Sequence, residues 1–136
     1  MDFRASSLAT SLVALTLSGC AAAPDNLTQA IAACNSGARY VEIRDSGIVY
    51  RVLGERGSQS GVHEGFLIRF PYRANGAVTR VEDNVDITGP IPLRRGDQVT
   101  LQGQFECNDQ VIHWTHHDPR GRHLAGYITV NGKTYQ

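Results

Sequence analysis

Four of the five histidines lie within eleven residues, 113–123, in the stretch HWTHHDPRGRH. The same stretch contains the only tryptophan, Trp114, and the carboxylate of Asp118. Histidine imidazoles can bind a metal, act as general acids or bases, or hydrogen-bond within a loop. Which of these they do depends on which side chains share a face, and therefore on the elements that carry them.

A metal site is one hypothesis for this stretch. Zinc or another divalent metal would take two or three of the imidazoles, with Asp118 or Glu106 completing the coordination or acting as a base. The sequence lacks the short ligand pairs HExxH and CxxC that mark many zinc sites, and a strand would divide the histidines between two faces. The candidate metal ligands are His113, His116, His117 and His123.

Two other interpretations need no metal. In one, histidine and threonine side chains hydrogen-bond across a hairpin whose turn Asp118 caps, and the cluster is structural. In the other, exposed histidine, arginine and tyrosine side chains line a shallow face that contacts a ligand. Perturbed polar clusters mark functional sites in only a fraction of proteins, so all three interpretations stay open. The candidate ligand-binding or catalytic residues are His63, Asn84, Asp86, His113, Thr115, His116, His117, Asp118 and His123.

The elements around the motif are predicted to be strands. β-Branched residues lead into it and favour a strand over a helix. On a strand, Ile112 and Trp114 point the same way, and we expect both to be buried. His113 and Thr115 then lie on the outer face.

A turn is expected directly after this strand. Residues 118–121, DPRG, have the signature of a type I turn. The resulting hairpin would place His123 at the start of the next strand, beside His116 and His117.

The rest of the chain alternates as short strands do. Residues 39–54 predict a long first strand whose inward face changes phase over residues 45–47, so that Ile48, Tyr50 and Val52 continue it. The second strand buries Phe66, Ile68 and Phe70, and the third points Val81 and Val85 inward. Five or six short strands, the first long and bent, predict a mainly β fold: a small OB-like Greek-key barrel preceded by one N-terminal helix.

The predicted helix and the fourth strand each carry a cysteine. Asn26 and Gln29 have capping-box spacing, and the apolar stripe that follows ends at Cys34. Residues 97–107 alternate so that Cys107 also faces inward. A Cys34–Cys107 disulfide would hold the helix against the sheet, although spacing alone also permits two buried thiols.

The N-terminus has the features of an export signal. Residues 1–19 place Arg4 before a short apolar run that ends in LSGC, which resembles the lipobox of bacterial lipoproteins. This resemblance implies cleavage before Cys20 and acylation of its thiol by chains such as palmitate, which would anchor the protein in a lipid bilayer. We expect a signal peptide over 1–19, a lipidated tether over 20–25 and one domain over 26–136. Ala21 stands where many enteric lipoproteins retained in the inner membrane have an aspartate, so this resemblance implies the outer membrane, facing the periplasm, over the inner membrane.

Charge and composition limit the partners. The chain has 13 basic and 13 acidic residues, and this neutral balance argues against general nucleic-acid binding. We expect instead a small ligand, an oligosaccharide or an envelope protein.

The histidine motif also resembles that of a known family. VIHWTHHDPRGRHLAGYI, together with residues 63–70, DNVDI, RRGDQV and GQFE, is similar to an uncharacterised family of small exported bacterial proteins. The similarity runs from about Tyr40 to Gln136. The chain departs from the family where Cys107 replaces an aromatic residue and Tyr127 replaces a tryptophan, and the first departure supports a disulfide particular to this protein. Because this family is a domain of unknown function, the resemblance implies no reaction.

Two functions of different classes follow. We expect a lipid-anchored cell-envelope protein that uses the 113–123 hairpin as an OB-like binding module. The alternative is a metal-dependent hydrolase, a nuclease or phosphoesterase, that uses the same histidines. A purely structural envelope lipoprotein is a third possibility.

Overall fold

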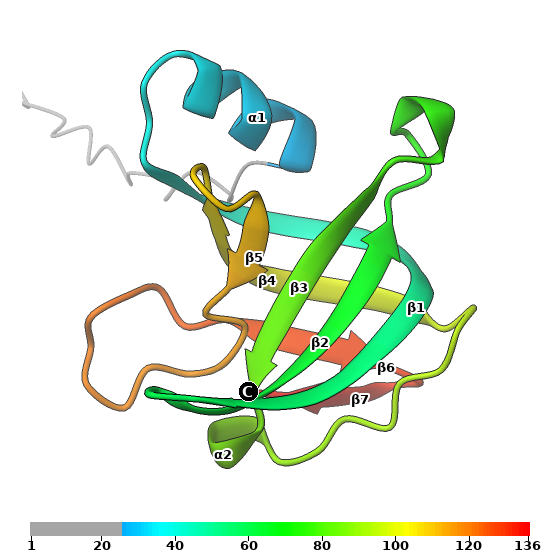
Figure 1. Cartoon of the computed structure of the whole chain (residues 1–136), viewed down its shortest axis with the longest axis vertical. Coiled ribbons are helices and arrows are strands. Elements are labelled where there is room, and N and C mark those ends of the chain that lie inside the picture. The colour runs from blue at the N-terminus through cyan, green and yellow to red at the C-terminus, as the bar shows by residue number, and fades with distance from the viewer. Residues whose placement is uncertain (1–25) are drawn as a thin grey trace, which may run out of the picture.

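The computed structural model describes residues 26–136 (Figure 1). In chain order the elements are α1 (Leu27–Asn35), β1 (Tyr40–Ser58), β2 (Gly61–Arg69), the 3-10 turn η1 (Ala74–Gly76), β3 (Val78–Asn84), α2 (Val85–Thr88), β4 (Gln98–Glu106), β5 (Val111–His113), β6 (Tyr127–Val130) and β7 (Lys133–Tyr135). The predicted signal peptide, Cys20 and the tether lie outside the described residues. No described helix is long and apolar enough to cross a membrane.

Five strands form a closed ring in the order β1-β2-β3-β5-β4, and β4 pairs back with β1. The pairings in the ring are antiparallel except for β3 with β5, which is parallel. The ring closes because β1 is long: residues 40–48 pair with β4, and residues 48–58 pair with β2. The predicted mainly β, OB-like architecture preceded by a helix is therefore confirmed. The structure has seven strands, of which β6 and β7 extend the sheet beyond the ring.

The inward face of β1 is continuous through its middle. Ile43, Gly47 and Val49 are buried in alternation, whereas Ile48 and Tyr50 are each 38% exposed. The predicted phase change over residues 45–47 is therefore wrong, and the register shift comes after Val49. The apolar alternation suggested a phase change because the interior position 47 is a glycine and adds no apolar side chain to the pattern. A Cβ there would lie 2.6 Å from a backbone oxygen of β2, so only glycine allows the two strands to approach this closely.

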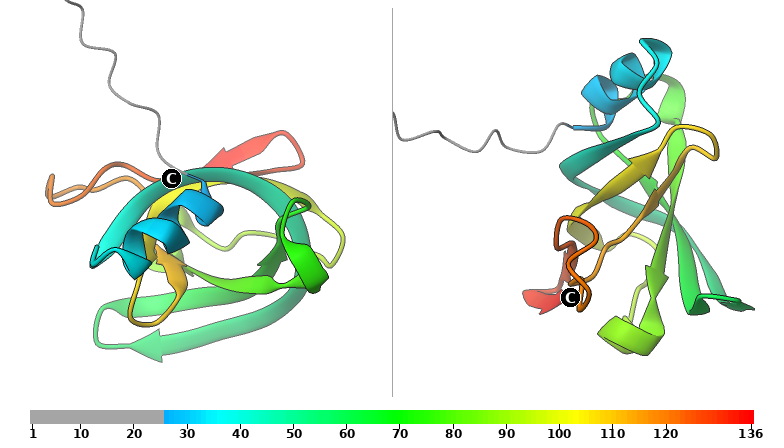
Figure 2. Two further views of the ribbon diagram at one scale, coloured as in Figure 1. Left: turned by 90° about the horizontal axis from the view of Figure 1, so that it is seen from above. Right: turned by 90° about the vertical axis from the view of Figure 1, so that its left-hand side faces the viewer.

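The apolar core fills the ring, and α1 covers one of its ends (Figure 2). The predicted capping box is present: the Asn26 side chain accepts from the Gln29 backbone N–H, and the Gln29 side chain accepts in return. Cys34 and Cys107 form a disulfide with Cα atoms 5.5 Å apart, as predicted, although Cys107 lies just beyond the end of β4. The helix is thus attached to the ring by both packing and a covalent bond. The largest fully buried side chains are those of Phe66, Phe70, Phe105, Leu27, Ile43, Ile68, Leu101, Ile112, Ile128, Val49, Val81 and Val99.

The histidine motif lies in a loop and not in the predicted hairpin. β5 pairs with residues 104–106 of β4, and β6 pairs with residues 99–102 of the same strand. β5 and β6 therefore lie one after the other along the same edge of β4. Residues 114–126 connect them, and we call this segment the histidine loop. In Figure 1 this loop (orange) projects from the ring on the same side as the tip of the β1–β2 hairpin. His123 lies within the loop and does not begin a strand.

The predicted burial of Trp114 is also wrong. Trp114 has a left-handed backbone with φ 57° and is half-buried, whereas Thr115 is fully buried. One left-handed residue shifts the alternation, so Thr115 points inward instead of outward. The loop then returns close to this point: a Cβ on Gly126 would lie 2.0 Å from the carbonyl oxygen of Trp114. Only glycine fits at position 126.

The third strand ends earlier than predicted. Asn84 caps the short helix α2 by accepting the Asp86 N–H, so Val85 begins a helix and does not extend β3 inward. The inward position after Val81 is occupied by Asp83, which is 1% exposed. A buried carboxylate thus lies at the end of the ring opposite α1.

Candidate ligand-binding groove

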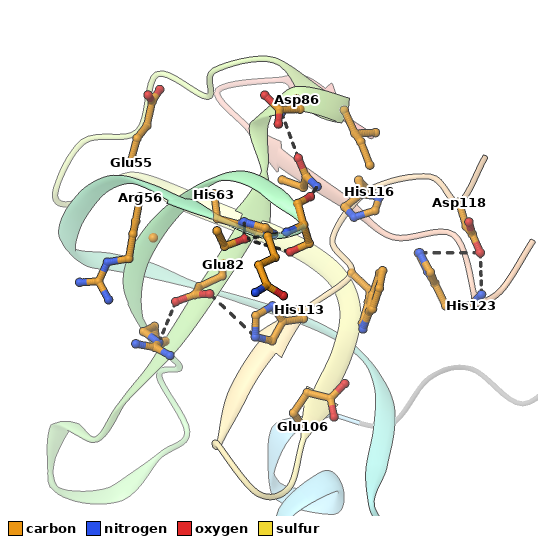
Figure 3. A pocket seen from close by; sticks show the side chains of 18 of the residues that line it. Glu55, Arg56, His63, Glu82, Asp86, Glu106, His113, His116, Asp118 and His123 are labelled. Atoms are coloured by element: carbon orange, nitrogen blue, oxygen red, sulfur yellow. Dashed lines mark hydrogen bonds and ion pairs between the residues drawn. The ribbon is translucent and has the colours of Figure 1, made fainter. Parts of the chain in front are cut away.

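A groove of about 1110 Å³ crosses the outer face of β2, β3 and β5 (Figure 3). Its floor carries His63, Glu82 and His113. One wall is the tip of the β1–β2 hairpin, residues 53–60, and the opposite wall is the histidine loop. The β4–β5 turn and α2 close the two ends. The groove therefore lies on the face that OB barrels commonly use for oligosaccharides and oligonucleotides.

The floor contains a charged network at its centre. Glu82 binds the Arg80 guanidinium through one oxygen at 3.2 Å, and its other oxygen lies 3.9 Å from Nε2 of His113. Burial lowers the pKa of His113, and the carboxylates of Glu82 and Glu106 offset part of that effect. His113 therefore presents a neutral imidazole near neutral pH, able to donate or accept one hydrogen bond.

The hairpin wall is held by polar side chains from the floor and α2. The carboxylate of Asp86 accepts the Val62 N–H at 2.9 Å, and the Asn84 amide donates to the Ser60 carbonyl at 3.1 Å. Nδ1 of His63 lies 3.3 Å from the Ser58 hydroxyl. Asn84 and Asp86 thus have an evident structural role: they fix the hairpin tip against the end of β3.

The histidine loop presents three aromatic rings. The ring centroids of Trp114 and His123 are 4.5 Å apart, and those of His116 and His123 are 5.4 Å apart and nearly perpendicular. Nδ1 of His116 donates to the His117 carbonyl at 2.7 Å. The neck of the loop is closed by the Gly126 N–H, which donates to the His116 carbonyl at 2.8 Å. Trp114 therefore faces the groove from a closed loop.

Asp118 organises the tip of the loop. Although desolvation opposes its ionisation, backbone N–H groups of Arg120, His123 and Arg122 donate to its carboxylate and hold its pKa at about 2. The Gly121 N–H donates to the Asp118 carbonyl at 3.2 Å, which confirms the predicted turn. Asp118 is therefore a fixed anion whose hydrogen-bonding capacity is largely used by the loop.

His123 has one buried nitrogen without a partner. Its side chain is 5% exposed, and Nδ1 donates to the Leu124 carbonyl at 2.8 Å. Within residues 26–136, Nε2 forms no hydrogen bond; the nearest charged atom is an Asp118 oxygen at 3.8 Å. Buried polar atoms are nearly always hydrogen-bonded, so such an exception in the wall of a groove needs an explanation.

Two buried carboxylates beneath the groove were not predicted as site residues. Glu64 and Asp83 are direct neighbours across β2 and β3, and both point into the ring. Burial raises the pKa of each, while Thr88 and Thr115 donate hydrogen bonds to Asp83. The Asp83–Thr115 bond of 2.7 Å connects the start of the histidine loop to the interior of the ring. The alternation that placed Val81 inward was the available signal for Asp83.

The structure gathers seven of the nine candidate site residues around the groove: His63, Asn84, Asp86, His113, His116, Asp118 and His123. Thr115 is buried beneath it, and His117 is exposed on the loop. Among residues 26–136, no three His, Cys, Asp or Glu side chains are placed to hold an ion. His113 lies on the floor of the groove, and Nδ1 of both His116 and His123 is bound to a backbone carbonyl.

A family model described as "Protein of unknown function (DUF3465)" matches residues 10–136. The chain belongs to this family. The DUF3465 match covers every described residue, so the ring and both walls of the groove are within the family domain. Searches of curated proteins and of solved structures find no match.

Proposed function

We propose that this DUF3465 protein binds an extended polar ligand in the groove, as a lipid-anchored module of the bacterial cell envelope. The observation that carries the binding proposal is Trp114, whose backbone is held in the left-handed region so that the indole lies in the wall of the groove. Such a conformation costs a bulky residue roughly 1–2 kcal/mol. Strained residues of this kind cluster at functional sites.

The construction of the groove supports binding over a purely structural role. A hydrogen-bonded network that only stabilised the fold would satisfy its own polar atoms, yet Nε2 of His123 is buried without a partner among the described residues. The floor offers a neutral imidazole at His113 and a carboxylate at Glu82. An aromatic ring beside such polar groups suits a ligand with both apolar and polar surface.

The only tryptophan of the chain is an intrinsic probe of this groove. Titration with chitohexaose, a neutral oligosaccharide, and with oligoalanines should produce a saturable change in Trp114 emission for at least one of them. Glu82→Gln should weaken that response, whereas Tyr50→Phe, on β1 away from the groove, should leave it unchanged. If both classes of probe leave the emission and its quenching by iodide unchanged, the binding proposal is wrong.

The envelope location rests on LSGC at residues 17–20. Acylation of Cys20 would tether the domain through the few residues that precede α1. Expression of Cys20→Ser in a bacterial host should give a form that no longer incorporates labelled palmitate. Membrane fractionation of a mature Cys20→Ser protein would contradict the anchor.

A further inference from the structure

We infer that the ligand of the groove is a short peptide whose amino group binds near the β4–β5 turn and whose carboxylate binds near the tip of the histidine loop. This inference rests on the proposed binding function and specifies its ligand. It is carried by those charged side chains of the groove that are not already bound to other groups of the described residues.

Several charges of the groove have partners within the protein. Arg80 and Glu82 bind each other on the floor. Asp86 accepts the Val62 N–H, and Asp118 accepts backbone N–H groups of its own loop. These groups shape the groove, and they have less capacity left for a ligand.

The remaining charges are separated by sign. Glu106 and Asp109 border the groove at the β4–β5 turn, while Arg120 and Arg122 border it at the loop tip. Within residues 26–136, none of these four side chains takes part in an ion pair. Figure 3 shows Glu106 at one end of the site and Asp118 on another side. The backbone N–H groups of Arg120 and Arg122 donate to the Asp118 carboxylate, so both arginines lie in the same loop tip as Asp118. With the anionic Asp118 counted against Arg120 and Arg122, the loop tip still carries one net positive charge, so the groove offers a negative end and a positive side.

The third border of the groove is the tip of the β1–β2 hairpin, and it adds no net charge. Glu55 and Arg56 on the hairpin tip contribute one charge of each sign. A polyanion would meet Glu106 and Asp109, and a polycation would meet the loop arginines. A ligand with separated amino and carboxylate groups matches both, because complementary charges select partners and reject others.

The middle of the groove fits a peptide that runs from the β4–β5 turn to the tip of the histidine loop. The Trp114 ring offers apolar surface beside His123, and His113 can exchange one hydrogen bond with a peptide group. Nδ1 of His123 is bound to the Leu124 carbonyl, and Nε2 has no hydrogen-bond partner among the described residues. A peptide group that reached Nε2 after a small movement of the loop would give a partner to the one buried side-chain polar atom that lacks one within residues 26–136.

The test uses oligoalanines of three to six residues with free ends, followed by Trp114 emission and calorimetry. For the peptide of the best-fitting length, N-acetylation should lower the affinity about fivefold, and C-amidation should lower it by a similar factor. This is the range for exposed ion pairs. The double variant Glu106→Gln/Asp109→Asn should bind the N-acetylated peptide and the free peptide with equal affinity. The double variant Arg120→Gln/Arg122→Gln should bind the C-amidated peptide and the free peptide with equal affinity. Arg95→Gln, an exposed arginine outside the groove, is the matched control and should change neither preference.

The outcomes separate the two proposals. Binding of chitohexaose without binding of any peptide would overturn the peptide inference and leave the binding function standing. Equal affinity for free and blocked peptides would also overturn it, since the charged ends would then play no part. Absence of any response from both classes of probe would overturn both proposals.

Discussion

The backbone conformation of Trp114 leads to a prediction whose sign is unusual. In the left-handed region an alanine costs roughly 1–2 kcal/mol, whereas glycine adopts it freely. Glycine loses about 0.5–1 kcal/mol more chain entropy on folding, which offsets part of that advantage. Trp114→Gly should therefore be about 0.5–1 kcal/mol more stable than Trp114→Ala, because both variants lack the indole and differ only in backbone preference.

Urea unfolding followed by far-ultraviolet circular dichroism measures this difference, since the variants no longer have a tryptophan to observe. Val78, a 37% exposed residue of β3 without a left-handed backbone, is the matched control. There the alanine variant should be more stable than the glycine variant by about 0.5–1 kcal/mol. If alanine is also the more stable replacement at Trp114, the residue is not left-handed in solution and the account of the loop is wrong.

Three other changes test the framework around the groove. Gly126→Ala should lower the free energy of unfolding by about 3 kcal/mol, because its Cβ would lie 2.0 Å from a loop carbonyl; Gly57→Ala, with open space around it, should change it by less than about 0.5 kcal/mol. Replacing Cys34 or Cys107 with serine should cost about 4 kcal/mol, because the disulfide closes a separation of 73 residues; reduction of the wild-type protein should match it in the same urea assay. Burial raises the folded pKa of Asp83 above its ordinary 3.8, so the stability it contributes is present below that value and is lost as the pH rises through the folded pKa. Asp83→Asn should therefore reduce the fall in melting temperature between about pH 4 and pH 7, and an unchanged fall would contradict the burial of this charge.

The sequence predicts the parts of the fold that follow from regular patterns. The alternation that buries Phe66, Ile68 and Phe70 has period two, and the capping box of α1 has a fixed spacing. The disulfide follows because Cys34 continues the apolar stripe of the helix while Cys107 continues the inward face of a strand. Each of these inferences depends on local chemistry alone.

The candidate site was harder to predict because single residues interrupt the patterns there. Nothing in the sequence indicates that Trp114 is left-handed, since bulky residues rarely are, and this one dihedral angle exchanges the predicted positions of Trp114 and Thr115. Gly126 was the available signal, because a glycine in a strand pattern indicates close approach of another backbone. Asp83 was missed since an unpaired carboxylate is seldom buried, although alternation from Val81 pointed it inward.

The most direct test of the central claim is residue-level mapping of the groove in solution. The ¹⁵N-labelled protein, titrated with the best-bound free-ended oligoalanine, should show its largest chemical-shift changes at the Trp114 indole N–H and at the amides of His63, Glu82 and His113. The amides of Tyr50 and Arg95, which lie outside the groove, should not shift. Shifts confined to Tyr50 and Arg95, or no saturable shift at any residue of the groove, would contradict the account.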